Sequence, residues 1–130
     1  MGLPAAKKGD QILSTDIHII LVPTGPSVTP TPTPMPFTGI IDNGLSSDVN
    51  IMGSPAAVVG STATNTPSHI PVGGSFASPP KNQGRIIAGS ATVLINNKPA
   101  ARTSDQALTC NDPADLPSGT VLAAGTVLIG

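Results

Sequence analysis

Two histidines and one cysteine are the side chains of this sequence best suited to bind a metal ion. His18, His69 and Cys110 are the only residues of their types in the chain. Two imidazoles and one thiolate form a borderline-soft ligand set that suits Zn²⁺, with Fe²⁺ as an alternative. A single cysteine cannot form an internal disulfide, so Cys110 is a buried core thiol, a reactive thiol or a metal ligand. No local motif such as CxxC or HExxH is present, so any shared site depends on the elements that position these residues.

Each of the three residues ends a repeated segment. The segments are MGLPAAKKGDQILSTDIH, IMGSPAAVVGSTATNTPSH and INNKPAARTSDQALTC, which end at His18, His69 and Cys110. The interval from the proline of Pro-Ala-Ala to the candidate ligand is 14 residues in the first two segments and 11 in the third. Three copies in register predict a pseudo-threefold domain, whose symmetry would bring the three candidate ligands to one axis.

The Pro-Ala-Ala triplets are predicted to be the corners of this arrangement. Proline fixes φ and gives up its N–H, and two alanines permit close approach of neighbouring segments. Only the third triplet is followed by arginine. The corner residues are Pro4, Ala5 and Ala6; Pro55, Ala56 and Ala57; and Pro99, Ala100 and Ala101 with Arg102.

A second pattern consists of a short apolar strand, a small-residue turn and another apolar strand. It occurs as GIIDNGLSSDVNIMG at 39–53, GRIIAGSATVLINN at 84–97 and GTVLAAGTVLIG at 119–130. Each copy predicts a β-hairpin. If the C-terminal TVLIG lies beside the N-terminal MGLPAA, the three hairpins close into a ring.

The composition favours one β-rich, turn-rich domain over residues 1–130. The chain has 14 glycines and 15 prolines, its seven acidic residues are all Asp, and its only aromatic residues are Phe37 and Phe76. Glycine and proline disfavour helices, so we expect an all-β fold with a core of Val, Ile, Leu and Ala. IHIILV suits a strand. We expect three surface connections, of which VPTGPSVTPTPTPMPFT should be extended polyproline rather than strand.

The charge and hydropathy exclude several classes of protein. The formal net charge is -1 with only six basic residues, which leaves nucleic-acid binding without electrostatic support. No apolar run reaches 18 residues, so no membrane span is expected. No secretory signal is visible at the N-terminus.

The fourth ligand of the predicted metal site stays open. A structural zinc site uses four protein ligands, and no third histidine exists. Met35 in PMPF is the soft side chain of the first connection, although a thioether is a poor zinc ligand. Water, Asp16 and Asp112 are the alternatives, and Met35 is equally suited to packing alone.

These segments resemble the PAAR-repeat proteins, the tips of contractile injection systems such as type VI secretion and phage-tail-like particles. The matching stretches include GLPAAKKGD, DIHIILVP, PAAVVGSTATNTPSHIP and GSATVLINNKPAAR, and they extend over essentially the whole chain. The resemblance implies a cone with a flat base and an apex that carries a metal, usually zinc, held by three histidines and one cysteine. His18, His69 and Cys110 match three of these ligands. Met35 stands where the third family histidine is expected.

The resemblance also implies a structural function rather than an enzymatic one. The base would cap a trimeric valine-glycine-repeat spike protein, one copy per trimer, and the point would pierce a target membrane. Effector cargo is a further implied partner, and the end of the chain at its third hairpin predicts no appended effector domain. We expect the protein in the cytoplasm until it is loaded and exported at the spike tip. The alternative function is a small metal-dependent hydrolase that uses water bound at His18, His69 and Cys110, but the chain has no Glu to serve as general base.

Overall fold

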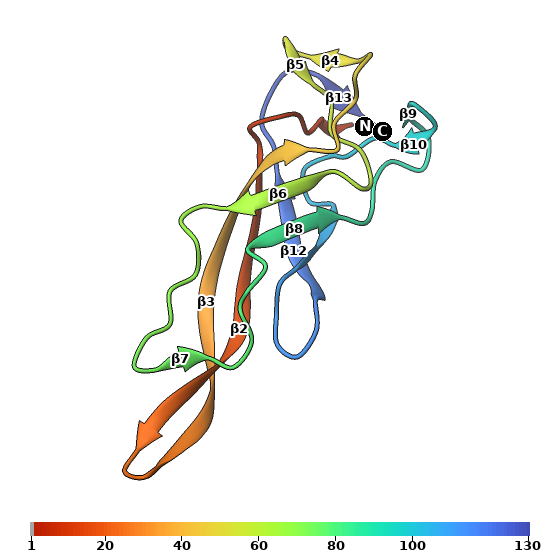
Figure 1. The fold of residues 1–130 in the computed structure, drawn as a ribbon. Helices are drawn as coiled ribbons and strands as arrows, with labels where there is room; N and C mark the ends of the chain where they lie inside the picture. Colours follow the sequence, from red (N-terminus) through yellow and green to blue (C-terminus); the bar gives the residue numbers. More distant parts are fainter. Residues whose placement is uncertain (1) are drawn as a thin grey trace.

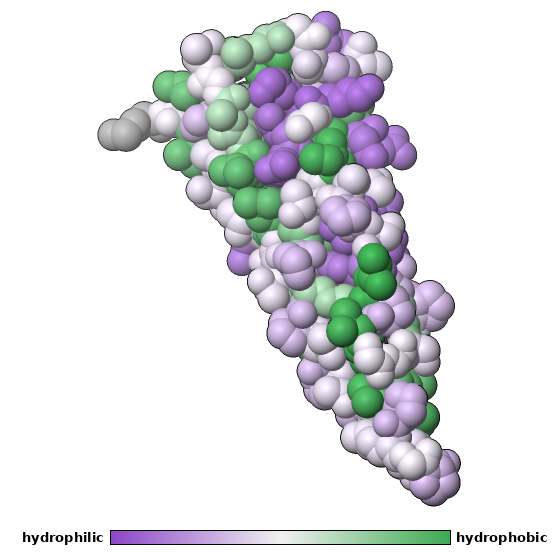
Figure 2. All heavy atoms as spheres, turned by 90° about the vertical axis from the view of Figure 1, so that its left-hand side faces the viewer, coloured by the Kyte–Doolittle hydropathy of each residue, from purple (hydrophilic) through white to green (hydrophobic). Residues whose placement is uncertain are grey.

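The molecule is an all-β cone, which confirms the predicted fold class. The structure, a computed structural model, describes residues 2–130. Both termini and several short strands lie at the broad end, and a long hairpin tapers away from it (Figure 1). The space-filling view shows the taper from broad end to point (Figure 2). The described residues contain no helix, and therefore none able to span a membrane.

Six antiparallel strands close into a small barrel below the broad end. The strand order is β12-β11-β8-β6-β3-β2, and β12 also pairs with β2, so the sheet closes on itself. A seventh strand, β7, pairs with the far part of β2. Closure leaves the barrel without an edge that could pair with another chain. The strands are β2 (Gln11–Thr24), β3 (Ser27–Asn43), β6 (Thr62–Asn65), β7 (Ser75–Phe76), β8 (Gln83–Ile86), β11 (Gln106–Thr109) and β12 (Leu116–Leu122).

Three antiparallel pairs of two-residue strands form the broad end; two are hairpins, and the third is their equivalent, in which the two ends of the chain pair. They are β4 (Asn50–Ile51) with β5 (Ser54–Pro55), β9 (Leu94–Ile95) with β10 (Lys98–Pro99), and β13 (Leu128–Ile129) with β1 (Leu3–Pro4). The third pairs the last strand with the first, so the predicted ring closure is confirmed. Each hairpin leads directly into a Pro-Ala-Ala corner.

The prediction that 39–53, 84–97 and 119–130 each fold into one hairpin is wrong in its pairing. The first apolar strand of each segment belongs to the barrel, as part of β3, β8 or β12, whereas the second pairs with the strand that precedes the next Pro-Ala-Ala. In the first two segments, a serine hydroxyl redirects the chain between the two strands. Ser46 Oγ accepts hydrogen bonds from the N–H groups of Asp48 and Val49, and Ser90 Oγ accepts from those of Thr92 and Val93. These local bonds turn the chain outward to the broad end instead of back along the strand.

The three corners are joined by a cyclic set of backbone hydrogen bonds. Ala6 N–H donates to Ala101 C=O at 2.9 Å, Ala101 N–H to Ala57 C=O at 3.0 Å, and Ala57 N–H to Ala6 C=O at 3.0 Å. All three alanines are 0% exposed. A side chain larger than methyl has no room where three backbones meet, so the corner requires alanine at this position.

Each corner is followed by a tight turn with an equivalent cap. Asp10, Ser61 and Asp105 accept a hydrogen bond from the backbone N–H three residues earlier, at 3.0, 3.0 and 2.7 Å. The residue before each cap has positive φ, and two of these residues are glycine, which adopts this conformation at little cost. The turns send each repeat from its corner into the barrel.

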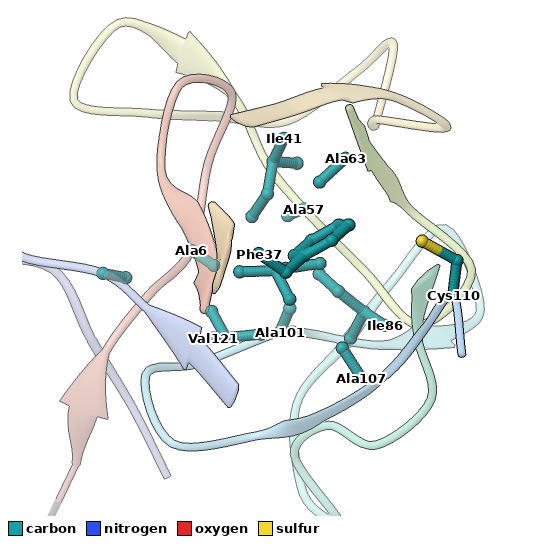
Figure 3. Close-up of a cluster of buried hydrophobic side chains, with 12 residues drawn as sticks. Ala6, Phe37, Ile41, Ala57, Ala63, Ile86, Ala101, Ala107, Cys110 and Val121 are labelled. Atoms are coloured by element: carbon teal, nitrogen blue, oxygen red, sulfur yellow. The ribbon is translucent and has the colours of Figure 1, made fainter. Parts of the chain in front are cut away.

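The barrel core surrounds one aromatic ring. Phe37 is 1% exposed and lies at the centre of the cluster, with Ile41, Ile86 and Val121 around it and Cys110 at its margin (Figure 3). Glycines in two of the barrel strands, β3 and β8, make room for the ring. A Cβ built on Gly39 would lie 2.7 Å from Phe37 Cε1, and one on Gly84 would lie 3.2 Å from Phe37 Cζ.

The Pro/Thr-rich connection is a strand, so the polyproline prediction is wrong. Residues 27–43 form β3, which pairs with β2 over all 14 residues of the latter. The prolines recur at every second position, and therefore share one edge of the strand. Ile17 and Ile19 turn their backbone N–H groups away from β3, toward the side chains of the Cys110 loop. The backbone nitrogens of their cross-strand partners Pro34 and Pro32 therefore also point away from β2. A proline at such a position removes no hydrogen bond from the β2–β3 ladder.

The corner packing predicts a strong size limit. Ala57→Leu should destabilise the protein by about 2–3 kcal/mol or more, because the added carbons must enter a filled space at the axis and disturb the cyclic hydrogen bonds. Ala114→Leu, at an exposed site, is the matched control and should change the free energy of unfolding by less than about 0.5 kcal/mol. Urea denaturation measures both. Equal stability of the two variants would contradict the crowded corner.

Candidate metal centre

Four potential metal ligands converge inside the tapered half of the molecule. Asp16, His18, His69 and Cys110 each offer one ligand atom, and these atoms all lie within 4.8 Å of one another. The structure therefore brings together the three residues that the repeats predict and adds Asp16, one of the open alternatives. The β2–β3 hairpin continues beyond this cluster, from His18 to Thr24, for roughly 20 Å at about 3.3 Å per residue.

Three elements supply the cluster. Asp16 and His18 lie two residues apart on β2, and so project from the same face of the strand. His69 comes from the loop after β6, where its backbone N–H donates to Asn82 Oδ1 at 2.8 Å. Cys110 directly follows β11. The spacing of Asp16 and His18 on one strand face is the signal from which the sequence could have singled out Asp16.

The separations within the cluster suit a tetrahedral metal ion. Asp16 Oδ2 lies 3.0 Å from His69 Nε2 and 3.4 Å from Cys110 Sγ, and Cys110 Sγ lies 3.7 Å from His18 Nε2. Neighbouring ligands of tetrahedral zinc are separated by about 3.3–3.8 Å, as follows from bond lengths of about 2.0–2.3 Å. Both distances from Cys110 Sγ lie in this range, whereas Asp16 Oδ2 and His69 Nε2 are closer, at the distance of a hydrogen bond. Nitrogen, oxygen and sulfur donors in this number are also the set that zinc prefers, so the residues fit the metal that the fold implies.

The cluster is closed to solvent, as a structural metal site is. Asp16 is 0% exposed, His18 1% and Cys110 2%. Two surface depressions reach it from outside: one includes His18, Cys110 and Asp112 in its lining, and the other includes His69 and Met35. A metal ion at this centre would have its ligands supplied by the protein, as in a structural site.

Asp112 lies beside His18 and is not part of the convergent group of ligand atoms. Its Oδ2 lies 3.6 Å from His18 Nδ1, on the ring nitrogen opposite to the one that faces Cys110. The same oxygen accepts a hydrogen bond from Ile19 N–H at 2.8 Å, which holds the carboxylate in place. At 3.6 Å the two groups form no hydrogen bond, and His18 Nδ1 is a buried nitrogen without a hydrogen-bond partner among the described residues.

Met35 lies next to the cluster, on the neighbouring strand β3. It is the direct cross-strand partner of Asp16, so its side chain is on the same face of the sheet, and it is 6% exposed. Met35 also lines the depression that includes His69. The predicted role of Met35 as a weak ligand stays a prediction, and its burial suits packing.

The Cys110 thiol is strongly held in its protonated form when no metal is bound. Burial, and then the charge of Asp16, raise its pKa to about 11. Metal binding requires the thiolate, so a metal ion must displace this proton.

A family model described as PAAR motif matches the chain twice, over residues 24–107 and 77–130. The chain belongs to the PAAR-motif family. PAAR proteins are structural, spike-tip-type components of contractile secretion systems, and they associate with spike proteins. Comparison with curated proteins and with solved structures gave no match.

The raised pKa of Cys110 predicts a pH dependence of stability in the metal-free PAAR protein. Above pH 9 the thiol ionises in the unfolded chain but stays protonated in the folded one, so the folded state binds more protons. The free energy of unfolding should therefore fall between pH 9 and 11, by on the order of 2 kcal/mol. Urea denaturation in the presence of a chelator measures this loss.

Cys110→Ser is the control for that titration, because serine does not ionise in this range. The variant should lose less stability than the wild type between pH 9 and 11, while lysines contribute equally to both. Parallel pH profiles for the two proteins would show that Cys110 is not held protonated in the fold.

Proposed function

We propose that this protein caps a trimeric spike protein, one copy per trimer, and forms the point that enters a target membrane. The observation that carries the proposal is the pseudo-threefold broad end. Three equivalent hairpins surround an axis marked by the cyclic bonds of Ala6, Ala57 and Ala101. A monomer with this symmetry can present a similar surface to each of three identical chains.

The broad end also has the apolar surface that a stable complex needs. Large hydrophobic side chains on its hairpins and their approaches are exposed, although the barrel below already has a core. Leu94 is 60% exposed, Leu128 59% and Met52 54%. Val49, Val127 and Leu3 are also exposed. Apolar groups grouped in this way at one end of a protein mark a binding surface.

The metal would act as a cross-link between segments. It would join β2, the loop that carries His69 and the chain after β11. Bound zinc would supply ligand bonds here and no reaction, which is the role of zinc in structural sites. The taper visible in Figure 2 then suits a mechanical point. In this proposal the protein is cytoplasmic before loading, leaves at the spike tip and travels with effector cargo.

Mixing with a trimeric valine-glycine-repeat spike fragment tests the proposed cap. The expected product is a complex of one PAAR protein per three spike chains, measured by native mass spectrometry or light scattering. Three copies per trimer, or the absence of a complex, would sink the proposal.

Leu94→Asp should weaken this complex by at least about tenfold, because a charge would be buried against the spike. Leu116→Asp is the matched control. Leu116 is 50% exposed at the end of β12 that is remote from the broad end, so the variant should bind as the wild type does. Titration calorimetry compares the two, and equal losses would place the binding surface elsewhere.

Zinc should stabilise the metal-free protein, because it binds the folded cluster and has no such site in the unfolded chain. At a zinc concentration 100 times the dissociation constant the gain is about 2.7 kcal/mol. Thermal melts with and without zinc measure the gain, and Cys110→Ser should abolish most of it. If the variant keeps both its metal content and the shift in Tm, Cys110 is not a ligand.

A further inference from the structure

Asp16 is a buried carboxylate without a lysine or arginine partner, and its one ion-pairing neighbour among residues 2–130 is the imidazole of His69. Asp16 is 0% exposed, and among residues 2–130 no lysine or arginine forms an ion pair with it. Its close polar neighbours are His69 at 3.0 Å, Cys110 at 3.4 Å and Thr109 at 2.6 Å. A carboxylate removed from water needs positive charge nearby, and a buried charge without it costs several kcal/mol.

The two oxygens of Asp16 have different surroundings. Oδ2 faces the imidazole of His69 and the thiol of Cys110, at the place where the candidate ligand atoms converge. Oδ1 instead accepts the hydroxyl hydrogen bond of Thr109. One oxygen is thus held by the protein while the other is directed into the cluster.

We propose that Asp16 Oδ2 is the fourth metal ligand, in place of the histidine that the family resemblance implies, and that Thr109 positions it. The inference rests on the metal centre of the proposed function and specifies its ligand set as one aspartate, two histidines and one cysteine. As metal ligands, the Asp16 carboxylate and the Cys110 thiolate carry two negative charges in total, and the two imidazoles are neutral. A divalent cation therefore makes the buried centre electrically neutral, whereas three histidines and one cysteine would leave one positive charge.

Thr109 is itself fixed by a small polar network. Its Oγ1 lies 3.0 Å from Ser118 Oγ and 3.2 Å from Ser14 Oγ, and Asn111 Nδ2 donates to it at 3.3 Å. Thr109 has one hydroxyl proton, and the 2.6 Å contact assigns that proton to Asp16 Oδ1. Asn111 Nδ2 and Ser118 Oγ can fill the two acceptor sites of the hydroxyl, so Thr109 cannot turn away without breaking these bonds. This arrangement limits Asp16 to one metal bond.

Met35 is the competing fourth ligand, and the charges disfavour it. Its thioether is neutral and a weak donor, so a metal bound by Met35 would leave Asp16 unused beside it. The direct pairing of Met35 with Asp16 in the β2–β3 ladder instead gives Met35 a packing role against the carboxylate.

X-ray absorption at the zinc edge of the wild-type protein tests the ligand set without any substitution. The expected shell contains one sulfur at about 2.3 Å and three nitrogen or oxygen atoms at about 2.0–2.1 Å. A shell with two sulfurs would place Met35 on the metal and overturn the proposal.

Zinc affinity of variants, measured by competition with a chromogenic chelator, tests the two residues separately. Asp16→Asn keeps the shape but removes the charge, and should weaken binding by at least about a hundredfold; Met35→Leu, the matched control, should change it by less than about threefold. Thr109→Val should cost about ten- to a hundredfold, and Thr109→Ser should restore most of the loss. Cobalt spectra of each variant report whether the centre stays tetrahedral.

Several results would overturn the inference. Wild-type affinity in Asp16→Asn, or an equal loss in Met35→Leu, would remove Asp16 from the ligand set. Wild-type affinity in Thr109→Val would remove Thr109 as a positioning residue. Spike binding is measured on the same preparations, so that the two proposals can be judged separately. If zinc binds without Asp16, only this inference is refuted. If the wild-type protein binds zinc but no spike, only the proposed cap is refuted.

Discussion

The cyclic hydrogen bonds among Ala6, Ala57 and Ala101 determine the arrangement of the rest of the molecule. Each amide donates to one neighbouring repeat and each carbonyl accepts from the other, so no corner can shift without breaking bonds to both. The segments before the corners form the hairpins of the broad end, and the segments after them enter the barrel. The threefold relation of the broad end and the convergence of the candidate ligands both follow from this junction.

Much of this arrangement could be predicted from the sequence, because it depends on local chemistry that recurs three times. The Pro-Ala-Ala triplets, the pairing of the two chain ends and the convergence of His18, His69 and Cys110 all follow from the register of the repeats. The strand pairing at the broad end could not be predicted in the same way, since two apolar strands separated by small residues resemble a hairpin. Long-range hydrogen bonds decided their partners instead. The strand character of 27–36 could not be predicted, because proline content alone does not show which edge of a strand the prolines occupy.

The candidate site shows how the fold departs from its own symmetry. In the barrel the three repeats have nearly the same structure. Below the barrel, one repeat extends into the long β2–β3 hairpin, whereas the other two contribute to the site only a loop and the end of a strand. Asp16 belongs to the long hairpin and has no acidic counterpart in the other repeats. Comparison of the repeats therefore predicts three ligands. To predict the fourth, one must know which face of β2 lies toward the cluster and that the hydroxyl of Thr109 lies beside Asp16. Thr109 and Asp16 are hydrogen-bonded but 93 positions apart in the sequence. A contact between residues so far apart leaves no local sequence pattern from which it could be predicted.

The alternating prolines of β3 have a consequence for crowded solutions of this protein. Near the point, β3 has only β2 as a ladder partner, so its outer edge faces solvent. An ordinary strand edge offers both donors and acceptors and invites a second molecule to extend the sheet. This edge lacks the donors at Pro30, Pro32, Pro34 and Pro36. Two copies that meet point to point cannot form a continuous intermolecular ladder, so the narrow end can stay slender and extended without becoming a seed for fibrils.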